Sequence, residues 1–123
     1  MSYITSVGNL AAIPELNFDQ ERGYAYCYAR VLVSDRYRDE ADQWVNGPTT
    51  AYDLRVTGNQ AENLVQTAQD SGGHVRVMFS GTERVTPYVT REGVAGVNHE
   101  VRADEVAASM RGQSAVITKN PRR

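Results

Sequence analysis

A chain of 123 residues, 41% of them hydrophobic, has the size of one domain and enough apolar side chains to bury a core. Its formal net charge of −2 excludes a uniformly basic nucleic-acid binder. No apolar run approaches the roughly 20 residues of a membrane helix, and the N-terminus lacks a signal-peptide pattern. The single cysteine, Cys27, excludes an internal disulfide and suits a reducing cytoplasm.

The charged residues are unevenly distributed along the chain. Residues 106–123 carry +4 and no acidic residue, whereas the preceding residues carry −6. Twelve arginines stand against one lysine. A guanidinium group stacks on aromatic rings and binds phosphate in a way that an ammonium group cannot. This bias fits a phosphate-binding surface, and it fits a solvated surface that merely favours arginine.

The first elements in chain order are strands. Residues 3–13 are expected to form one, in which Gly8 indicates a bulge or a sharp bend. Residues 17–23 are polar and predict a turn. From residue 24 to 34 the hydrophobic period is two, which predicts a second strand with small apolar residues against the core. That face holds Ala25, Cys27, Ala29, Val31 and Val33, and the opposite face holds Tyr24, Tyr26, Tyr28 and Leu32.

Residues 35–49 are charged and end in Asn-Gly-Pro, which indicates a long hairpin excursion before a third strand at about 50–57. The next segment is the one convincing helix. Asn59 is expected to cap it, with Glu62 three residues later as in a capping box. Gly72-Gly73 is expected to end it. Its apolar stripe consists of Ala61, Leu64, Val65 and Ala68.

The last elements are again strands. Residues 74–81 predict a fourth strand that turns Val75, Val77 and Phe79 inward, and residues 83–90 and 97–106 predict a further hairpin. Residues 112–123 contain too few apolar side chains to pack, so we expect a short, basic, disordered tail. The folded domain is therefore expected to span residues 1–111.

Five strands with one short helix between the third and fourth is the order of an OB-fold, an all-β, five-stranded Greek-key barrel. A small barrel needs glycines and bulges where its long strands curl. Gly8 lies where the first strand would have to curl and pair with both halves of the sheet.

Catalysis is not expected. Asp104 and Glu105 are adjacent, so in a strand they point to opposite faces and cannot share a proton or a metal. His74 and His99 have no motif around them, and Cys27 reads as a buried, inert thiol rather than a nucleophile. The sequence contains no phosphate loop, zinc-ligand spacing or nucleophile elbow. We expect no enzyme activity, cofactor, metal or small-molecule substrate.

Aromatic residues in polar segments indicate another kind of site. Unpaired bases stack on exposed rings at about 1–3 kcal/mol each, while neighbouring cations bind the phosphates. The alternative is that tyrosines suit β-sheets and oligomer interfaces. For Tyr24, Tyr26 and Tyr28 both interpretations stay open, and a subunit contact or mixed packing is favoured. We expect the stacking rings and the arginines to lie along one outward surface of the barrel. The candidate stacking residues are Tyr37, Trp44, Tyr52 and Tyr88, and the candidate phosphate-binding residues are Arg36, Arg38, Arg55, Arg84 and Arg91.

Several segments resemble the bacterial single-stranded DNA-binding proteins. "VGNLAAIPELNF" is similar to the opening signature of that family, "QAENL" to its helix, "TREG" to its late hairpin and "EVRADEVAASMRG" to the last strand of actinobacterial members. The likeness covers about residues 4–111 in the same order. It implies an OB-fold protein that assembles as a homotetramer in the cytoplasm, associates with the nucleoid and binds single-stranded DNA without sequence preference, in support of replication, recombination or repair.

The resemblance transfers to particular residues only in part. Tyr37, Trp44, Tyr52 and Tyr88 match aromatic positions of the family, and Arg84 matches a basic one. Thr57 replaces a further aromatic, Ile13 replaces a common Asp, and Tyr26 and Tyr28 replace smaller residues.

The ending "KNPRR" has no acidic, Phe-terminated tip. The resemblance therefore implies a shorter, secondary paralogue or a phage-borne relative with an auxiliary role. The alternative function is a protein-interaction module that modulates the primary family member and binds little DNA. The biological occasion, the binding mode, the site size and the protein partners stay open.

Overall fold

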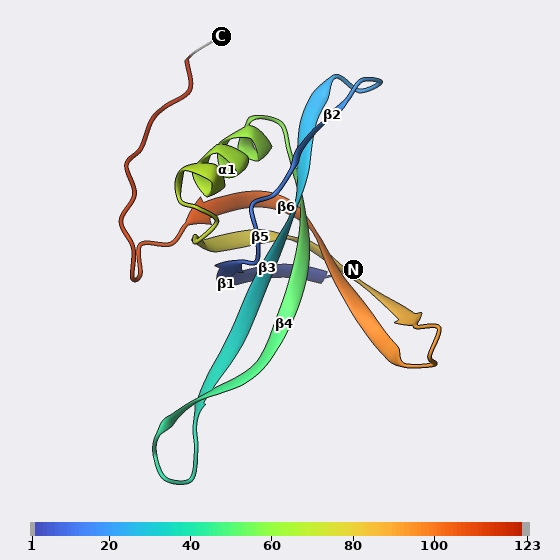
Figure 1. Cartoon of the computed structure of the whole chain (residues 1–123), viewed down its shortest axis with the longest axis vertical. Helices are drawn as coiled ribbons and strands as arrows, with labels where there is room; N and C mark the ends of the chain where they lie inside the picture. Colours follow the sequence, from blue (N-terminus) through green and yellow to red (C-terminus); the bar gives the residue numbers. More distant parts are fainter. Residues whose placement is uncertain (1, 122–123) are drawn as a thin grey trace.

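A computed structural model of the chain describes residues 2–121. Met1 lies outside the described residues, as do Arg122 and Arg123, which belong to the basic tail defined above. Strands dominate the structure and one helix interrupts them (Figure 1). The elements are β1 (Ser2–Leu10), β2 (Leu16–Asp19), β3 (Tyr24–Arg38), β4 (Trp44–Thr57), α1 (Asn59–Asp70), β5 (Arg76–Val89) and β6 (Ala95–Ala108).

Five long strands close into a barrel. The sheet order is β1-β5-β6-β4-β3-β2, and an additional pairing of β1 with β3 closes it. β1 pairs with β5 from Ser2 to Asn9 and with β3 through Asn9 and Leu10. Gly8 lies at this change of partner, and a β-carbon there would collide with the Leu32 carbonyl of β3. The expectation that the first strand pairs with both halves of the sheet at Gly8 is therefore confirmed, and only a residue without a side chain allows the two backbones to approach so closely.

The core confirms the alternation expected for residues 24–34. Ala25, Cys27, Ala29 and Val31 of β3 are buried, and the tyrosines between them are not. The helix α1 contributes its predicted apolar stripe and lies across one end of the barrel (Figure 1). The other buried core residues are Leu10, Leu54, Val56, Val75, Val77, Phe79 and Val101.

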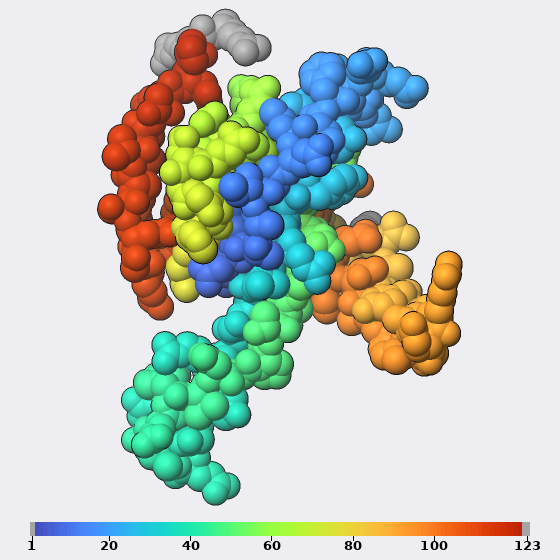
Figure 2. All heavy atoms as spheres, viewed as in Figure 1, coloured from blue at the N-terminus to red at the C-terminus, as the bar shows by residue number. Residues whose placement is uncertain are grey.

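Two hairpins extend from the barrel in different directions (Figure 2). Residues 35–49 were expected to form a long hairpin excursion outside the strands. Most of them belong to the strands, because β3 runs to Arg38 and β4 already begins at Trp44. The register shifts between Ser34 and Arg36, where β4 contributes one extra residue. The second hairpin joins β5 and β6, and β5 continues unbroken through residue 82, where two separate strands were expected. Both hairpins, the β3–β4 arm and the β5–β6 arm, expose side chains to solvent on both faces of their strands.

Two further local predictions are wrong. Residues 17–23, expected as a polar turn, begin with the end of β2, whose Asn17 pairs with Tyr26 of β3. The helix is not capped by Asn59, because Asn59 is already its first residue and no side chain caps it. Gly58 precedes it at φ 70°, a left-handed conformation that glycine adopts without strain. At the other end the prediction is confirmed, since the Gly73 N–H donates to the Ala68 carbonyl at 2.7 Å.

The chain beyond β6 runs beside α1 without regular secondary structure (Figure 1). The Gln113 side chain hydrogen-bonds the backbone of Arg76, and the Asn63 amide donates to Asn120 Oδ1 at 2.7 Å. The boundary at residue 111 and the disorder expected beyond it stay predictions. Within residues 2–121, no helix has the length and apolar character needed to cross a membrane.

Candidate nucleic-acid interface

Strands β3, β4, β6 and β5 lie side by side, and their side that points away from the core is called the outer face below. Strand pairing arranges its side chains in rows across the four strands, because directly paired residues point the same way. The first row is Tyr28, Arg55, Arg102 and Thr82. The second row is Arg30, Asp53, Glu100 and Arg84.

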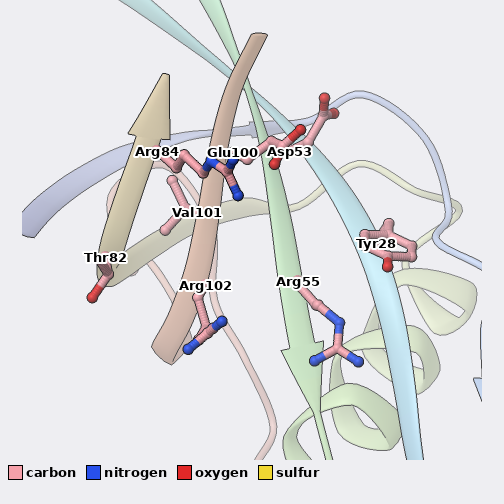
Figure 3. Close-up of a pocket in the computed structure, with 8 residues that line it drawn as sticks. All are labelled: Tyr28, Asp53, Arg55, Thr82, Arg84, Glu100, Val101 and Arg102. Atoms are coloured by element: carbon pink, nitrogen blue, oxygen red, sulfur yellow. The ribbon is translucent and has the colours of Figure 1, made fainter. Parts of the chain in front are cut away.

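All residues of these two rows except Arg30 line a groove of about 620 Å³ on the outer face. Figure 3 shows Arg102, Arg55 and Tyr28 following one another across neighbouring strands, with Arg84, Glu100 and Asp53 gathered beside them. The volume of the groove falls in the range of pockets that hold small ligands. Two of the predicted phosphate-binding residues, Arg55 and Arg84, are therefore brought together here.

Arg55 is held against the tyrosines of β3. Its guanidinium carbon lies 5.8 Å from the centroid of the Tyr24 ring and 5.3 Å from that of Tyr26. Its Nη2 donates to the Tyr24 hydroxyl at 3.1 Å. The hydroxyls of Tyr24 and Tyr28 raise the pKa of Arg55, while the bond from Arg55 is the largest cause that lowers the pKa of Tyr24. Arg55 is thus a fixed, fully charged group at the edge of the groove.

The arginines of the two rows differ in their partners. Arg30 forms an ion pair with Asp53, with Nη1 and Oδ1 3.5 Å apart. Within residues 2–121, no carboxylate lies within ion-pair distance of Arg55, Arg84 or Arg102. The groove therefore presents three guanidinium groups whose charge is not neutralised by a direct contact, and such groups bind phosphate oxygens well.

The tip of the β3–β4 hairpin carries a second cluster. Arg36 pairs with Asn46 and Arg38 pairs with Trp44, so these side chains share the outer face. The guanidinium carbons of Arg36 and Arg38 lie 5.5 and 5.2 Å from the centroid of the exposed Trp44 ring. Arg38 also donates to Asp42 at 3.1 Å. An exposed indole beside two arginines can stack a base and bind its phosphate.

Two of the expected stacking residues lie on the opposite side of the same strands. Tyr37 pairs with Val45 and is exposed. Tyr52 pairs with Val31 and is half-buried, with its ring centroid 5.6 Å from that of Phe79 and 5.3 Å from that of His99. Burial, followed by the charges of Glu83 and Asp35, raises the pKa of Tyr52. The four rings thus do not share one face, although neither Tyr37 nor Tyr52 is sealed in the core.

The remaining expected residues lie on the β5–β6 arm. Tyr88 is exposed and points to the same side of β5 as Arg84. It pairs with Gly96 and lines a smaller hollow of about 270 Å³ together with Arg30 and Asp53. Arg91 lies in the exposed turn that joins the two strands. The outer face therefore links the hairpin tip, the groove and Tyr88.

Two groove residues were missed as site residues from the sequence. Arg102 is surrounded in the chain by Glu100, Asp104 and Glu105, so its local sequence is acidic. For Tyr28 and its neighbours, the sequence left base stacking open but favoured a subunit contact or mixed packing. The alternation of β3 was a usable signal, because it already placed Tyr28 on the face opposite the core.

The fold and this surface define an OB-fold barrel with an arginine-rich, aromatic outer face. A model described as the single-strand binding protein family matches residues 1–109. The chain therefore belongs to the single-strand binding protein family.

Individual relatives agree with this assignment. The chain is 35% identical over 117 residues to "Single-stranded DNA-binding protein 2" of Streptomyces coelicolor, covering 94% of this chain and 57% of the relative. It is 32% identical over 120 residues to a single-stranded DNA-binding protein of Corynebacterium glutamicum, covering 97% of this chain and 52% of the relative. The chain thus spans little more than half the length of these relatives.

The fold is similar to a solved structure. The crystal structure of a small single-stranded DNA-binding protein from Streptomyces coelicolor superposes with a TM-score of 0.73 at 22% identity, covering 89% of this chain and 95% of that chain. The expected five-stranded OB-fold with one short helix before its last two strands is confirmed.

Proposed function

We propose that the chain binds single-stranded DNA without sequence preference, through base stacking and phosphate neutralisation. The observation that carries the proposal is the set of three arginines, Arg55, Arg84 and Arg102, that share a groove without carboxylate partners among the described residues. Family membership supports the same ligand. Trp44, between Arg36 and Arg38, supplies a stacking surface at the hairpin tip.

In the proposed mechanism, base stacking on the rings and phosphate binding by the arginines both contribute to the binding free energy. Each stacked base contributes about 1–3 kcal/mol. If each subunit neutralises about three or four phosphates, the salt slope of log K is about −2 to −3 per subunit. The slightly negative net charge of the chain limits long-range attraction, so stacking contributes more of the affinity than phosphate neutralisation does. The candidate residues predicted from the sequence are Tyr37, Trp44, Tyr52, Tyr88, Arg36, Arg38, Arg55, Arg84 and Arg91. Arg102 joins them because it lines the groove beside Arg55.

We also propose that the chain assembles as a homotetramer. The supporting feature is β1, which pairs with β5 on one edge and meets β3 only through Asn9 and Leu10. Residues 2–8 therefore leave a strand edge open, and such an edge pairs readily with another copy. Light scattering after gel filtration measures the mass directly, and a mass below that of four chains at micromolar concentration would refute this part.

The other parts of the proposal concern context. The barrel, residues 1–111, carries the binding, and residues 112–123 form an appended basic tail. The protein acts without catalysis in the cytoplasm, as an auxiliary component of replication, recombination or repair. A location in the reducing cytoplasm suits the free, buried thiol of Cys27.

The fluorescence of Trp44 tests the binding directly, because the chain contains one tryptophan. Titration with a thymidine oligonucleotide is expected to quench the signal through stacking, and the duplex of the same length is the control. Absence of quenching and of any anisotropy change at micromolar protein would overturn the proposal. The double variant Tyr52→Ala, Tyr88→Ala is expected to lose DNA affinity while its mass stays unchanged. A protein-interaction module would instead bind little DNA even before the substitutions.

A further inference from the structure

The first row of the outer face contains two arginines side by side. Arg55 of β4 pairs in parallel register with Arg102 of β6, and neighbouring strands lie about 4.8 Å apart. Like charges at directly paired positions destabilise a sheet unless something compensates them. The second row needs no such compensation, because Arg30 and Arg84 flank Asp53 and Glu100. The first row therefore has the charge pattern of an anion site, and the second row does not.

An exposed ring ends the same row. Tyr28 pairs with Arg55 across β3 and β4, and 59% of Tyr28 is exposed. The Tyr26 ring meets it edge to face, with the centroids 5.9 Å apart, so the orientation of the Tyr28 ring is supported from one side. Tyr28 itself lines the groove that contains Arg55 and Arg102 (Figure 3).

We propose that Tyr28, Arg55 and Arg102 form a subsite for one nucleotide of the single strand. The base stacks on Tyr28, and its phosphate lies between the guanidinium groups of Arg55 and Arg102. This inference rests on the proposed function and assigns Tyr28 to DNA rather than to a subunit contact. The charges of the two rows determine where the phosphate lies. It is attracted to Arg55 and Arg102 in the first row and repelled from Asp53 and Glu100 in the second.

The test uses the full chain and two variants with matched controls. Tyr28→Ala removes the ring, and Phe18→Ala is its control because 61% of Phe18 is exposed on β2, on the opposite side of the sheet. Arg102→Gln removes one charge from the groove. Arg76→Gln removes one charge from β5 outside the groove.

The probes are a thymidine oligonucleotide of about 16 nucleotides, the upper limit for one OB-fold, and an abasic oligonucleotide of the same length. Tyr28→Ala is expected to weaken binding of the thymidine strand by about 5- to 150-fold, the equivalent of one lost stack. It leaves binding of the abasic strand unchanged. Arg102→Gln is expected to weaken binding of both strands and to reduce the salt slope by about 0.7.

The outcomes are distinguishable. If the unaltered chain binds no single strand, the proposed function fails and this inference fails with it. If the chain binds but Tyr28→Ala and Arg102→Gln behave like Phe18→Ala and Arg76→Gln, only the subsite is refuted. If Tyr28→Ala lowers the mass in light scattering while affinity per subunit is unchanged, the ring belongs to a subunit contact and the subsite is again refuted.

Discussion

Gly96 offers a way to displace a stacking ring without removing it. Tyr88 crosses over Gly96 on the neighbouring strand, and a β-carbon at Gly96 would lie 2.5 Å from Cζ and Oη of Tyr88 and 2.9 Å from its Cε1. Such distances are impossible, so Gly96→Ala forces the ring to another rotamer. Because Tyr88 is an exposed side chain, this movement leaves the core intact. We expect less than about 1 kcal/mol of change in the free energy of unfolding.

The effect on DNA binding is expected to be much larger. Displacement of one stacking ring costs about 1–3 kcal/mol, or about 5- to 150-fold in affinity. Fluorescence anisotropy of a labelled thymidine oligonucleotide measures this change, and urea unfolding measures the stability. The double variant Gly96→Ala, Tyr88→Ala supplies the control, because it should bind no more weakly than Tyr88→Ala alone. Unchanged binding by Gly96→Ala, or additive losses in the double variant, would refute the role of Tyr88.

Three other changes probe the charge of the groove, the closure of the barrel and the buried thiol. The double variant Arg55→Gln, Arg84→Gln should reduce the salt slope of log K by about 1.4, measured from 50 to 200 mM salt. A reduction of the slope no larger than that caused by Arg76→Gln would contradict this. Gly8→Ala should lower the free energy of unfolding by about 1–3 kcal/mol in urea titrations, because its β-carbon meets the Leu32 carbonyl; an unchanged midpoint would disprove the close approach. Burial raises the pKa of the Cys27 thiol from 9.0 to about 11, so above pH 9 the unfolded chain loses this proton first. Stability should therefore fall by about 2 kcal/mol between pH 9 and 11 relative to Cys27→Ala, and parallel pH profiles would show the thiol to be unperturbed.

The parts of the fold that could be predicted are those with a strong local period. Alternation in residues 24–34 identified the buried face of β3, and the stripe from Ala61 to Ala68 identified the helix. β2 was missed because it is only four residues long, its apolar side chains Leu16 and Phe18 stay exposed, and its existence depends on pairing with β3. The missing cap has a similar cause, since Gly58 starts the helix through backbone conformation and leaves no side-chain pattern.

The candidate site was harder to predict because it is assembled across strands. The sequence identified Arg55 and Arg84, but their common groove depends on a parallel pairing of β4 with β6 that no local pattern encodes. The same reason hid Arg102, which lies in an acidic stretch of the chain but is paired with Arg55 in the sheet. Tyr37 and Trp44 were expected on one surface, yet in a two-residue period a shift of one position reverses the face.

Photo-crosslinking measures most directly whether unpaired bases lie on the outer face. An oligonucleotide that carries 5-bromodeoxyuridine in place of thymidine, bound to the full chain and irradiated, is digested and analysed by mass spectrometry. The account predicts crosslinks to peptides that contain Tyr28, Trp44 and Tyr88. A complex whose crosslinks fall only on β1 or on residues 109–121 would contradict it.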